Sequence, residues 1–159
     1  MPLVVSDSST LIHLAAIGRI ALLKHFHQTI TITPAVWQEV VVEGGGRAGA
    51  RQVEEAREGG WIEVAAPKDK DRLGLLRREP DLGQAEAETI ALAVERQADL
   101  VFLDETEARC TARVRGLRTA GVVGILIRAK VNGRIQSLQA AMNALQERSG
   151  FWIGEELYW

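Results

Sequence analysis

Four acidic residues stand where the chain could bring them together. Asp7 closes a short apolar run near the N-terminus, and Asp104 follows the apolar run Leu100 to Leu103. Glu39 and Glu86 lie in segments with helical spacing. Carboxylates packed together raise each other's pKa, and a divalent cation removes this conflict. Oxygen ligands favour Mg²⁺ or Mn²⁺ over zinc, so the chemistry predicted for such a cluster is metal-assisted hydrolysis of a phosphodiester.

These acids share one site only if the elements that carry them form a parallel sheet. Short apolar or β-branched runs alternate with helix-spaced segments, and two of the runs are apolar throughout, which is typical of parallel strands covered on both faces. Right-handed crossovers place the C-terminal ends of such strands at one edge. We therefore predict an α/β fold, an α/β/α sandwich with a central, mostly parallel sheet of four to five strands. The expected strands are 3–5, 29–32, 61–64 at an edge, 100–103 and a short one near 117–120.

The helices expected between these strands supply most of the remaining chain. They cover residues 11–17, 20–26, a segment from Pro34, 51–58, part of 67–80, 83–96, 105–114, 121–131 and 137–146. Residues 43–49 are predicted to be a flexible loop because Gly44-Gly45-Gly46 interrupts the helical pattern. The C-terminal helices, from about residue 121, and an aromatic tail complete one predicted domain over residues 1–159.

Length and composition limit the class of protein. The 159 residues fit one domain, and the longest apolar runs are far short of the roughly 20 residues that cross a bilayer. Without a recognisable signal peptide, we expect a soluble cytoplasmic protein with no membrane contact. The single cysteine, Cys110, permits no internal disulfide and no cysteine zinc cage, and its helical setting predicts a buried small hydrophobe.

The charges are unevenly distributed along the chain. The formal net charge is −2, yet residues 108–146 contain no Asp or Glu and carry seven basic side chains. A basic segment beside an acidic remainder can attract a polyanion, although a solvated helical face gives the same pattern. We take Arg109 and Arg113, which follow Asp104 most closely, as the candidate residues for binding such a polyanion, RNA or DNA.

Four motifs in series resemble those of the PIN-domain nucleases. The segment 4–12 around Asp7 looks like their opening motif, and 33–40, which holds Glu39, is similar to the second acidic motif. The segment 83–93 resembles the third motif in the form seen in a little-characterised prokaryotic branch with paired Glu, and 100–105 resembles the fourth. The order and spacing of the motifs cover residues 3–126, which makes the set more specific than any one motif.

This resemblance implies a PIN-like three-layer fold and an Mg²⁺- or Mn²⁺-dependent ribonuclease. Many such proteins are toxins of the VapC-like toxin–antitoxin class and form homodimers, so RNA, a cognate antitoxin and a second copy are the implied partners. Asp7, Glu39, Glu86 and Asp104 carry over as the catalytic, metal-binding acids. The third motif departs from the branch at Ala85, where Gly is frequent, and we favour Glu86 over Glu88. The second-rank candidates are Glu88, Glu105, Glu107, Ser9 and Thr10.

Two other functions remain open at this stage. A strand followed by Asp-x-x-Thr suggests an aspartyl-phosphate phosphatase, but that chemistry requires an acid two residues after the nucleophile, where this chain has Ser9. A non-catalytic PIN-like module that binds RNA or a protein is the second alternative, because the altered third motif would suit a weakened metal site.

Overall fold

The computed structural model describes residues 2–150, so the expected aromatic tail lies outside the described residues. Within that range, five strands form one sheet in which every pairing is parallel, in the order β3-β2-β1-β4-β5. The predicted α/β class is confirmed, and β3 lies at an edge as expected. The strands are β1 (Val4–Ser6), β2 (Ile30–Ile32), β3 (Ile62–Val64), β4 (Leu100–Phe102) and β5 (Thr119–Ala120).

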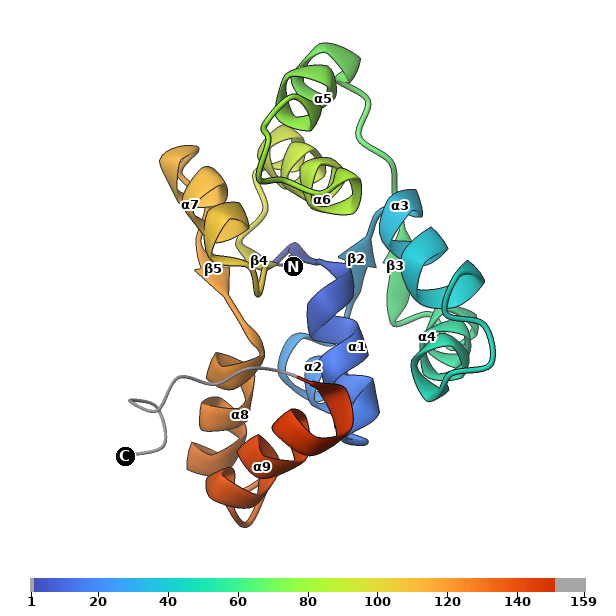
Figure 1. Ribbon diagram of the computed structural model, residues 1–159, viewed down its shortest axis with the longest axis vertical. Helices are drawn as coiled ribbons and strands as arrows, with labels where there is room; N and C mark the ends of the chain where they lie inside the picture. The colour runs from blue at the N-terminus through green and yellow to red at the C-terminus, as the bar shows by residue number, and fades with distance from the viewer. Residues whose placement is uncertain (1, 151–159) are drawn as a thin grey trace.

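Helices cover both faces of the sheet (Figure 1). One layer holds α1 (Ser8–Ala16), α2 (Ala21–His27), α4 (Ala48–Glu58), α8 (Val122–Val131) and α9 (Leu138–Ser149). The opposite layer holds α5 (Lys70–Arg77), α6 (Gln84–Arg96) and α7 (Thr106–Val114). The expected three-layer sandwich is therefore present.

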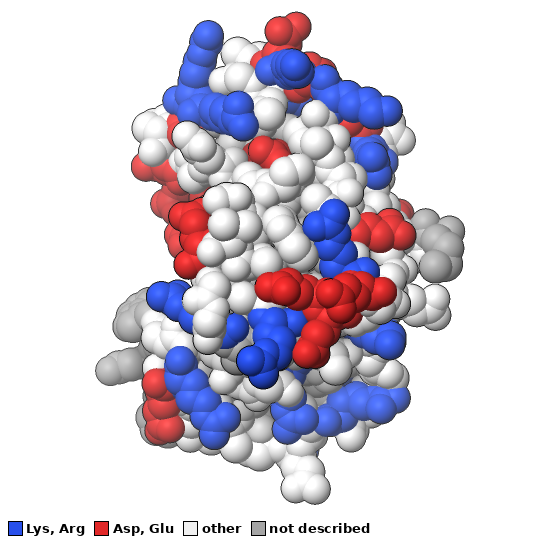
Figure 2. Space-filling model, turned by 90° about the vertical axis from the view of Figure 1, so that its right-hand side faces the viewer, with Lys and Arg blue, Asp and Glu red and all other residues white. Residues whose placement is uncertain are grey.

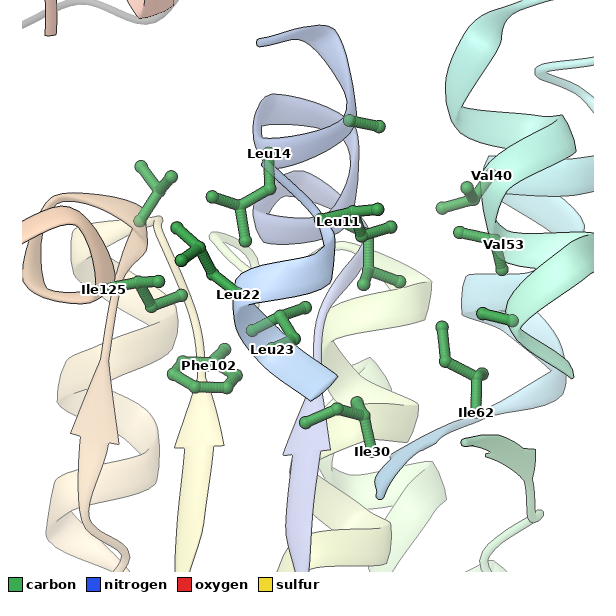
Figure 3. Packing of buried hydrophobic residues seen from close by; sticks show 14 of the residues in the cluster. Leu11, Leu14, Leu22, Leu23, Ile30, Val40, Val53, Ile62, Phe102 and Ile125 are labelled. Atoms are coloured by element: carbon green, nitrogen blue, oxygen red, sulfur yellow. The ribbon is translucent and has the colours of Figure 1, made fainter. Parts of the chain in front are cut away.

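The core is divided by the period-two alternation of the strands. Val4 and Phe102 pack with the α1 layer, whereas Val5 and Val101 pack with the α6 layer. Figure 3 shows the first of these clusters, in which Leu11 of α1 and Leu23 of α2 lie over the sheet. Burial on both faces explains why the central strands are apolar throughout.

Three sequence expectations are corrected by the fold. The helix expected from Pro34 is split into α3 (Pro34–Trp37) and a π-helical segment η1 (Gln38–Val42), and α4 begins within the expected glycine-rich loop. The expectation that Cys110 is buried is wrong, because α7 turns Ala108 and Ala112 toward the core and leaves Cys110 exposed.

No helix in residues 2–150 combines the length and the hydropathy needed to cross a bilayer. Figure 2 shows the side of the molecule near α3 and α4, where acidic and basic side chains are interspersed.

Candidate active site

The two strands at the centre of the sheet place Asp7 beside Asp104. β1 pairs with β4 in the register Ser6 to Phe102, so the residues that follow both strands leave the same edge. Asp7 is the N-cap of α1, and its Oδ1 accepts a hydrogen bond of 2.9 Å from the Thr10 amide. Its Oδ2 accepts a hydrogen bond of 3.1 Å from the Asp104 amide.

Burial makes the ionised form of Asp7 costly. The residue is 2% exposed, and this desolvation, followed by the charge of Asp104, raises the pKa of Asp7 from 3.8 to about 7. The hydrogen bonds from Thr10 and Asp104 act in the opposite direction, because they stabilise the carboxylate. Asp7 therefore titrates near neutral pH in the metal-free protein.

Asp104 is held by three elements at once. Its Oδ2 accepts a hydrogen bond of 2.9 Å from the Thr10 hydroxyl of α1, and its Oδ1 accepts one of 2.8 Å from the Val122 amide at the start of α8. Arg109 of α7 donates to the Asp104 carbonyl at 2.8 Å and to the Leu103 carbonyl at 3.2 Å. The loop after β4 is therefore fixed from α1, α7 and α8.

Glu86 reaches the same region from the opposite layer. A pocket of about 170 Å³ is lined by Asp7, Glu39, Glu86 and Glu105. Glu86 Oε1 accepts a hydrogen bond of 2.9 Å from the Gly83 amide, whereas its Oε2 is buried without a partner. Desolvation raises the pKa of Glu86, and the charges of Glu105 and Glu39 add to the shift. This small pocket thus concentrates carboxylates and contains an unsatisfied acceptor.

Glu39 owes its place to the break in the helix after β2. Thr33 caps α3 by accepting from the Val36 amide, and Pro34 takes the first helical position. The backbone then widens into η1, whose first turn carries Glu39. Single π turns often occur at functional sites. Glu39 is exposed and contributes to the wall of the small pocket.

Glu88 does not join this group. It is 8% exposed, and its Oε1 accepts a hydrogen bond of 3.1 Å from the Ala35 amide. Its Oε2 lies 3.5 Å from Arg77 Nη2 in an ion pair. The two oxygens of Glu88 therefore connect α6 to α3 and α5, and Glu88 is not among the residues that line the small pocket.

The remaining predicted residues lie around a larger neighbouring pocket of about 760 Å³. Arg109, Arg113, Glu107 and Asp104 line it, and Ser9 and Glu105 line both this pocket and the small one. Arg113 is exposed and donates to the Thr119 hydroxyl at 3.1 Å. The two pockets together place acidic groups beside two guanidinium groups.

Two features of the site were absent from the sequence predictions. A Cβ at Gly121 would lie 2.7 Å from Asp104 Oδ1, so only glycine leaves room for that carboxylate. The Ser8 hydroxyl is buried without a partner, and Ser8 lines the small pocket. In the sequence, the position of Gly121 between a short strand and a helix could have indicated its role. For Ser8, the only such signal was its position next to Asp7.

The residues present suit a hard divalent cation by their chemistry. The small pocket offers four carboxylates and two serine hydroxyls, all oxygen donors, and Glu86 Oε2 is buried without a partner. A cation would stabilise the ionised form of Glu86, which burial and then the neighbouring carboxylates disfavour. In the part of the chain that the structure describes, no three Asp, Glu, His or Cys side chains are already arranged to hold an ion. Binding would therefore require side chains such as the exposed Glu39 and Glu105 to turn toward Asp7.

Comparison with known proteins places these features in a family context. The model of a family described as DUF3368, a PIN domain, matches residues 3–159 and so covers nearly the whole chain. No protein with a curated description matches it.

Proposed function

The chain belongs to the PIN-domain family, whose fold is of the nuclease type, and we propose that it is an endoribonuclease that depends on Mg²⁺ or Mn²⁺. The observation that carries the proposal is the pairing of Asp7 with Asp104 beside a pocket that Asp7, Glu39, Glu86 and Glu105 line. These acids come from four separate parts of the chain. If each had only a structural role, they would not need to lie around one site.

The proposed roles follow from the position of each side chain. Asp7, Glu39, Glu86 and Asp104 would hold the cation, and Glu105, which lines the same small pocket, would add a fifth carboxylate. When bound, the cation would polarise a phosphate and supply a nucleophilic water at neutral pH. Arg109 and Arg113 would bind the adjoining phosphates from the wall of the larger pocket. Thr10 keeps the Asp104 carboxylate in place through its hydroxyl.

A cleavage assay with a structurally conservative variant tests this function. We expect the purified protein to cut a labelled single-stranded RNA with Mg²⁺ or Mn²⁺ and to lose this activity in EDTA. Asp104→Asn is a suitable variant, because its amide oxygen can accept from Val122 and its amide nitrogen can donate to the Thr10 hydroxyl. We expect it to be folded and slower by roughly 100-fold or more. Wild-type rates in this variant would contradict the assignment.

A non-catalytic RNA- or protein-binding module is the second candidate. The observation that favours it is the absence, within residues 2–150, of three ligand side chains already set around one point. Titration of Mn²⁺ into the protein by calorimetry separates the two functions. Heat that saturates in the wild type and is lost in Asp104→Asn supports the nuclease, whereas no binding at millimolar Mn²⁺ supports the module.

The proposal extends to a toxin role with a cognate antitoxin, and to a homodimer in the cytoplasm. Its support is the family relationship alone. A toxin would arrest growth when expressed alone, and co-expression of an adjacent short reading frame that encodes a DNA-binding protein would restore growth.

A further inference from the structure

Three arginines from separate parts of the chain line one pocket away from the acidic site. Arg19 lies between α1 and α2, Arg134 between α8 and α9, and Arg148 in the last turn of α9. The pocket measures about 500 Å³, and no carboxylate is among its lining residues. Within residues 2–150, none of the three arginines takes part in an ion pair. Like charges that converge without a counter-charge favour an anionic ligand.

The floor of this arginine pocket is apolar and made of small residues. Ala140, Ala141 and Ala144 of α9 line it beside Ile17. The hydroxyl of Ser137 already accepts from the Ala140 amide, so the start of α9 has its side-chain cap. The positive charge available to a ligand is therefore that of the guanidinium groups. Their planar donors suit the bidentate binding of phosphate.

A third pocket borders both the arginine pocket and the small acidic pocket, and we call the three pockets together the groove. This third pocket, of about 400 Å³, shares Glu39 with the small acidic pocket and Arg148 with the arginine pocket. Arg47 also lines this third pocket. The side chains of His13 and Ser149 are in contact, which holds the end of α9 on α1. The groove thus follows α1, whose rise from Asp7 to Ala16 is roughly 14 Å.

The lower part of the molecule carries more basic than acidic side chains on one of its sides (Figure 2). Figure 2 shows mostly Lys and Arg side chains over the lower third of its view, at the height where Figure 1 places α9. Carboxylates lie at one end of the groove and arginines at the other. A ligand that spans the groove would place one reacting group among the acids and further anionic groups among the arginines.

We propose that the arginine pocket binds the phosphate backbone of a single-stranded RNA whose scissile bond lies at the acidic site. This inference rests on the proposed function and adds to it a requirement for substrate length. The strand must extend a few nucleotides beyond the cleaved bond to reach Arg19 and Arg134. A dinucleotide would occupy the acidic end of the groove alone.

Binding without metal tests the arginine pocket separately from catalysis. The probe is a fluorescent single-stranded RNA of about 12 nucleotides, measured by anisotropy in EDTA. The variant Arg19→Ala/Arg134→Ala/Arg148→Ala is compared with Lys70→Ala/Arg78→Ala/Arg96→Ala, which removes three exposed charges from the α5 and α6 layer. Circular dichroism and melting temperature confirm that both variants are folded.

We expect the variant Arg19→Ala/Arg134→Ala/Arg148→Ala, the groove variant, to bind the RNA at least about 10-fold more weakly at low salt. The slope of log K against log salt should fall by about 2, since each phosphate contact on a single strand contributes about 0.7. The control variant should bind as the wild type does. Equal binding by the two triple variants would overturn the proposal. It would also be overturned if the groove variant lost as much activity on a dinucleotide as on the longer RNA.

The outcomes distinguish this inference from the nuclease function. A wild-type protein that binds the RNA through these arginines but does not cut it with Mn²⁺ would refute the nuclease and leave the groove intact. If the wild type cuts the RNA and the groove variant binds it as the wild type does, the nuclease function is supported and the arginine pocket is refuted. If the groove variant loses binding of polyglutamate and keeps binding of RNA, the pocket serves an acidic protein and the RNA assignment is wrong.

Discussion

The main-chain amide of Asp104 donates a 3.1 Å hydrogen bond to Oδ2 of Asp7. This contact joins the ends of two neighbouring strands that are 97 residues apart in sequence. It stabilises the ionised form of Asp7, while burial and the charge of Asp104 oppose ionisation more strongly. Ionising Asp7 therefore costs free energy in the folded protein, and a bound cation would lower that cost.

The raised pKa of Asp7 predicts an unusual dependence of stability on pH. Because the pKa of Asp7 is raised from 3.8 to about 7 in the folded protein, the folded state binds more protons than the unfolded state within this window. The contribution of Asp7 to the free energy of unfolding is therefore complete below about pH 4 and is lost as the pH rises through about 7. Urea unfolding in EDTA at several pH values measures it.

The variant Asp7→Asn separates this contribution from those of other groups. At pH 8 we expect it to be as stable as the wild type or more stable, because the buried charge is gone. At pH 5 it should be less stable, since its amide has one acceptor for the amides of Thr10 and Asp104. A stability difference that does not change with pH would show that Asp7 does not titrate in this range.

Glu86 and Glu88 should respond differently to substitution. Glu86→Gln retains an acceptor for the Gly83 amide, so we expect near wild-type stability with loss of activity. Glu88→Ala leaves the Ala35 amide without its acceptor and breaks the contact with Arg77, which should cost about 1–3 kcal/mol of stability and spare the activity of the folded protein. Unfolding and cleavage assays on both variants check this, and the opposite pattern would make Glu88 the third acid.

Gly121 should control the position of the Asp104 carboxylate. Its backbone angles, φ −129° and ψ −176°, are open to alanine, yet the added Cβ would lie 2.7 Å from Asp104 Oδ1. We expect Gly121→Ala to fold and to cut RNA at least about 10-fold more slowly, because the carboxylate must move. Gly74→Ala is the matched control: its Cβ meets nothing within 4 Å, and in α5 it should add about 1 kcal/mol of stability. Comparable activity in both variants would argue against this role for Gly121.

Metal should stabilise the wild type and not the site variants. A ligand present at 100 times its Kd adds about 2.7 kcal/mol to the free energy of unfolding. We therefore expect Mn²⁺ to raise the melting temperature of the wild type, EDTA to reverse the shift, and Asp7→Asn and Glu86→Gln to show little or none. Ca²⁺ serves as a comparison, because it prefers a larger ligand shell. An equal shift in all variants would mean that Mn²⁺ binds elsewhere.

Some features of the site became visible only with the tertiary contacts. Glu86 and Glu88 are two residues apart on one helix, and each follows an alanine, so the local sequence does not distinguish them. They differ because Ala35 and Arg77 occupy the oxygens of Glu88 and leave Glu86 Oε2 unpartnered. Likewise, Cys110 is exposed because of the direction in which α7 packs, which helical spacing alone did not reveal.

The amino-acid sequence by itself determined the class of fold and the edge at which Asp7 and Asp104 meet. Strands that are buried on both faces must be apolar, and parallel strands joined by helices must end on one side. The partners of each carboxylate, the π turn under Glu39 and the meeting of Arg19 with Arg134 and Arg148 were decided by the tertiary structure alone. These depend on contacts between segments far apart in the chain, whose geometry no local pattern encodes.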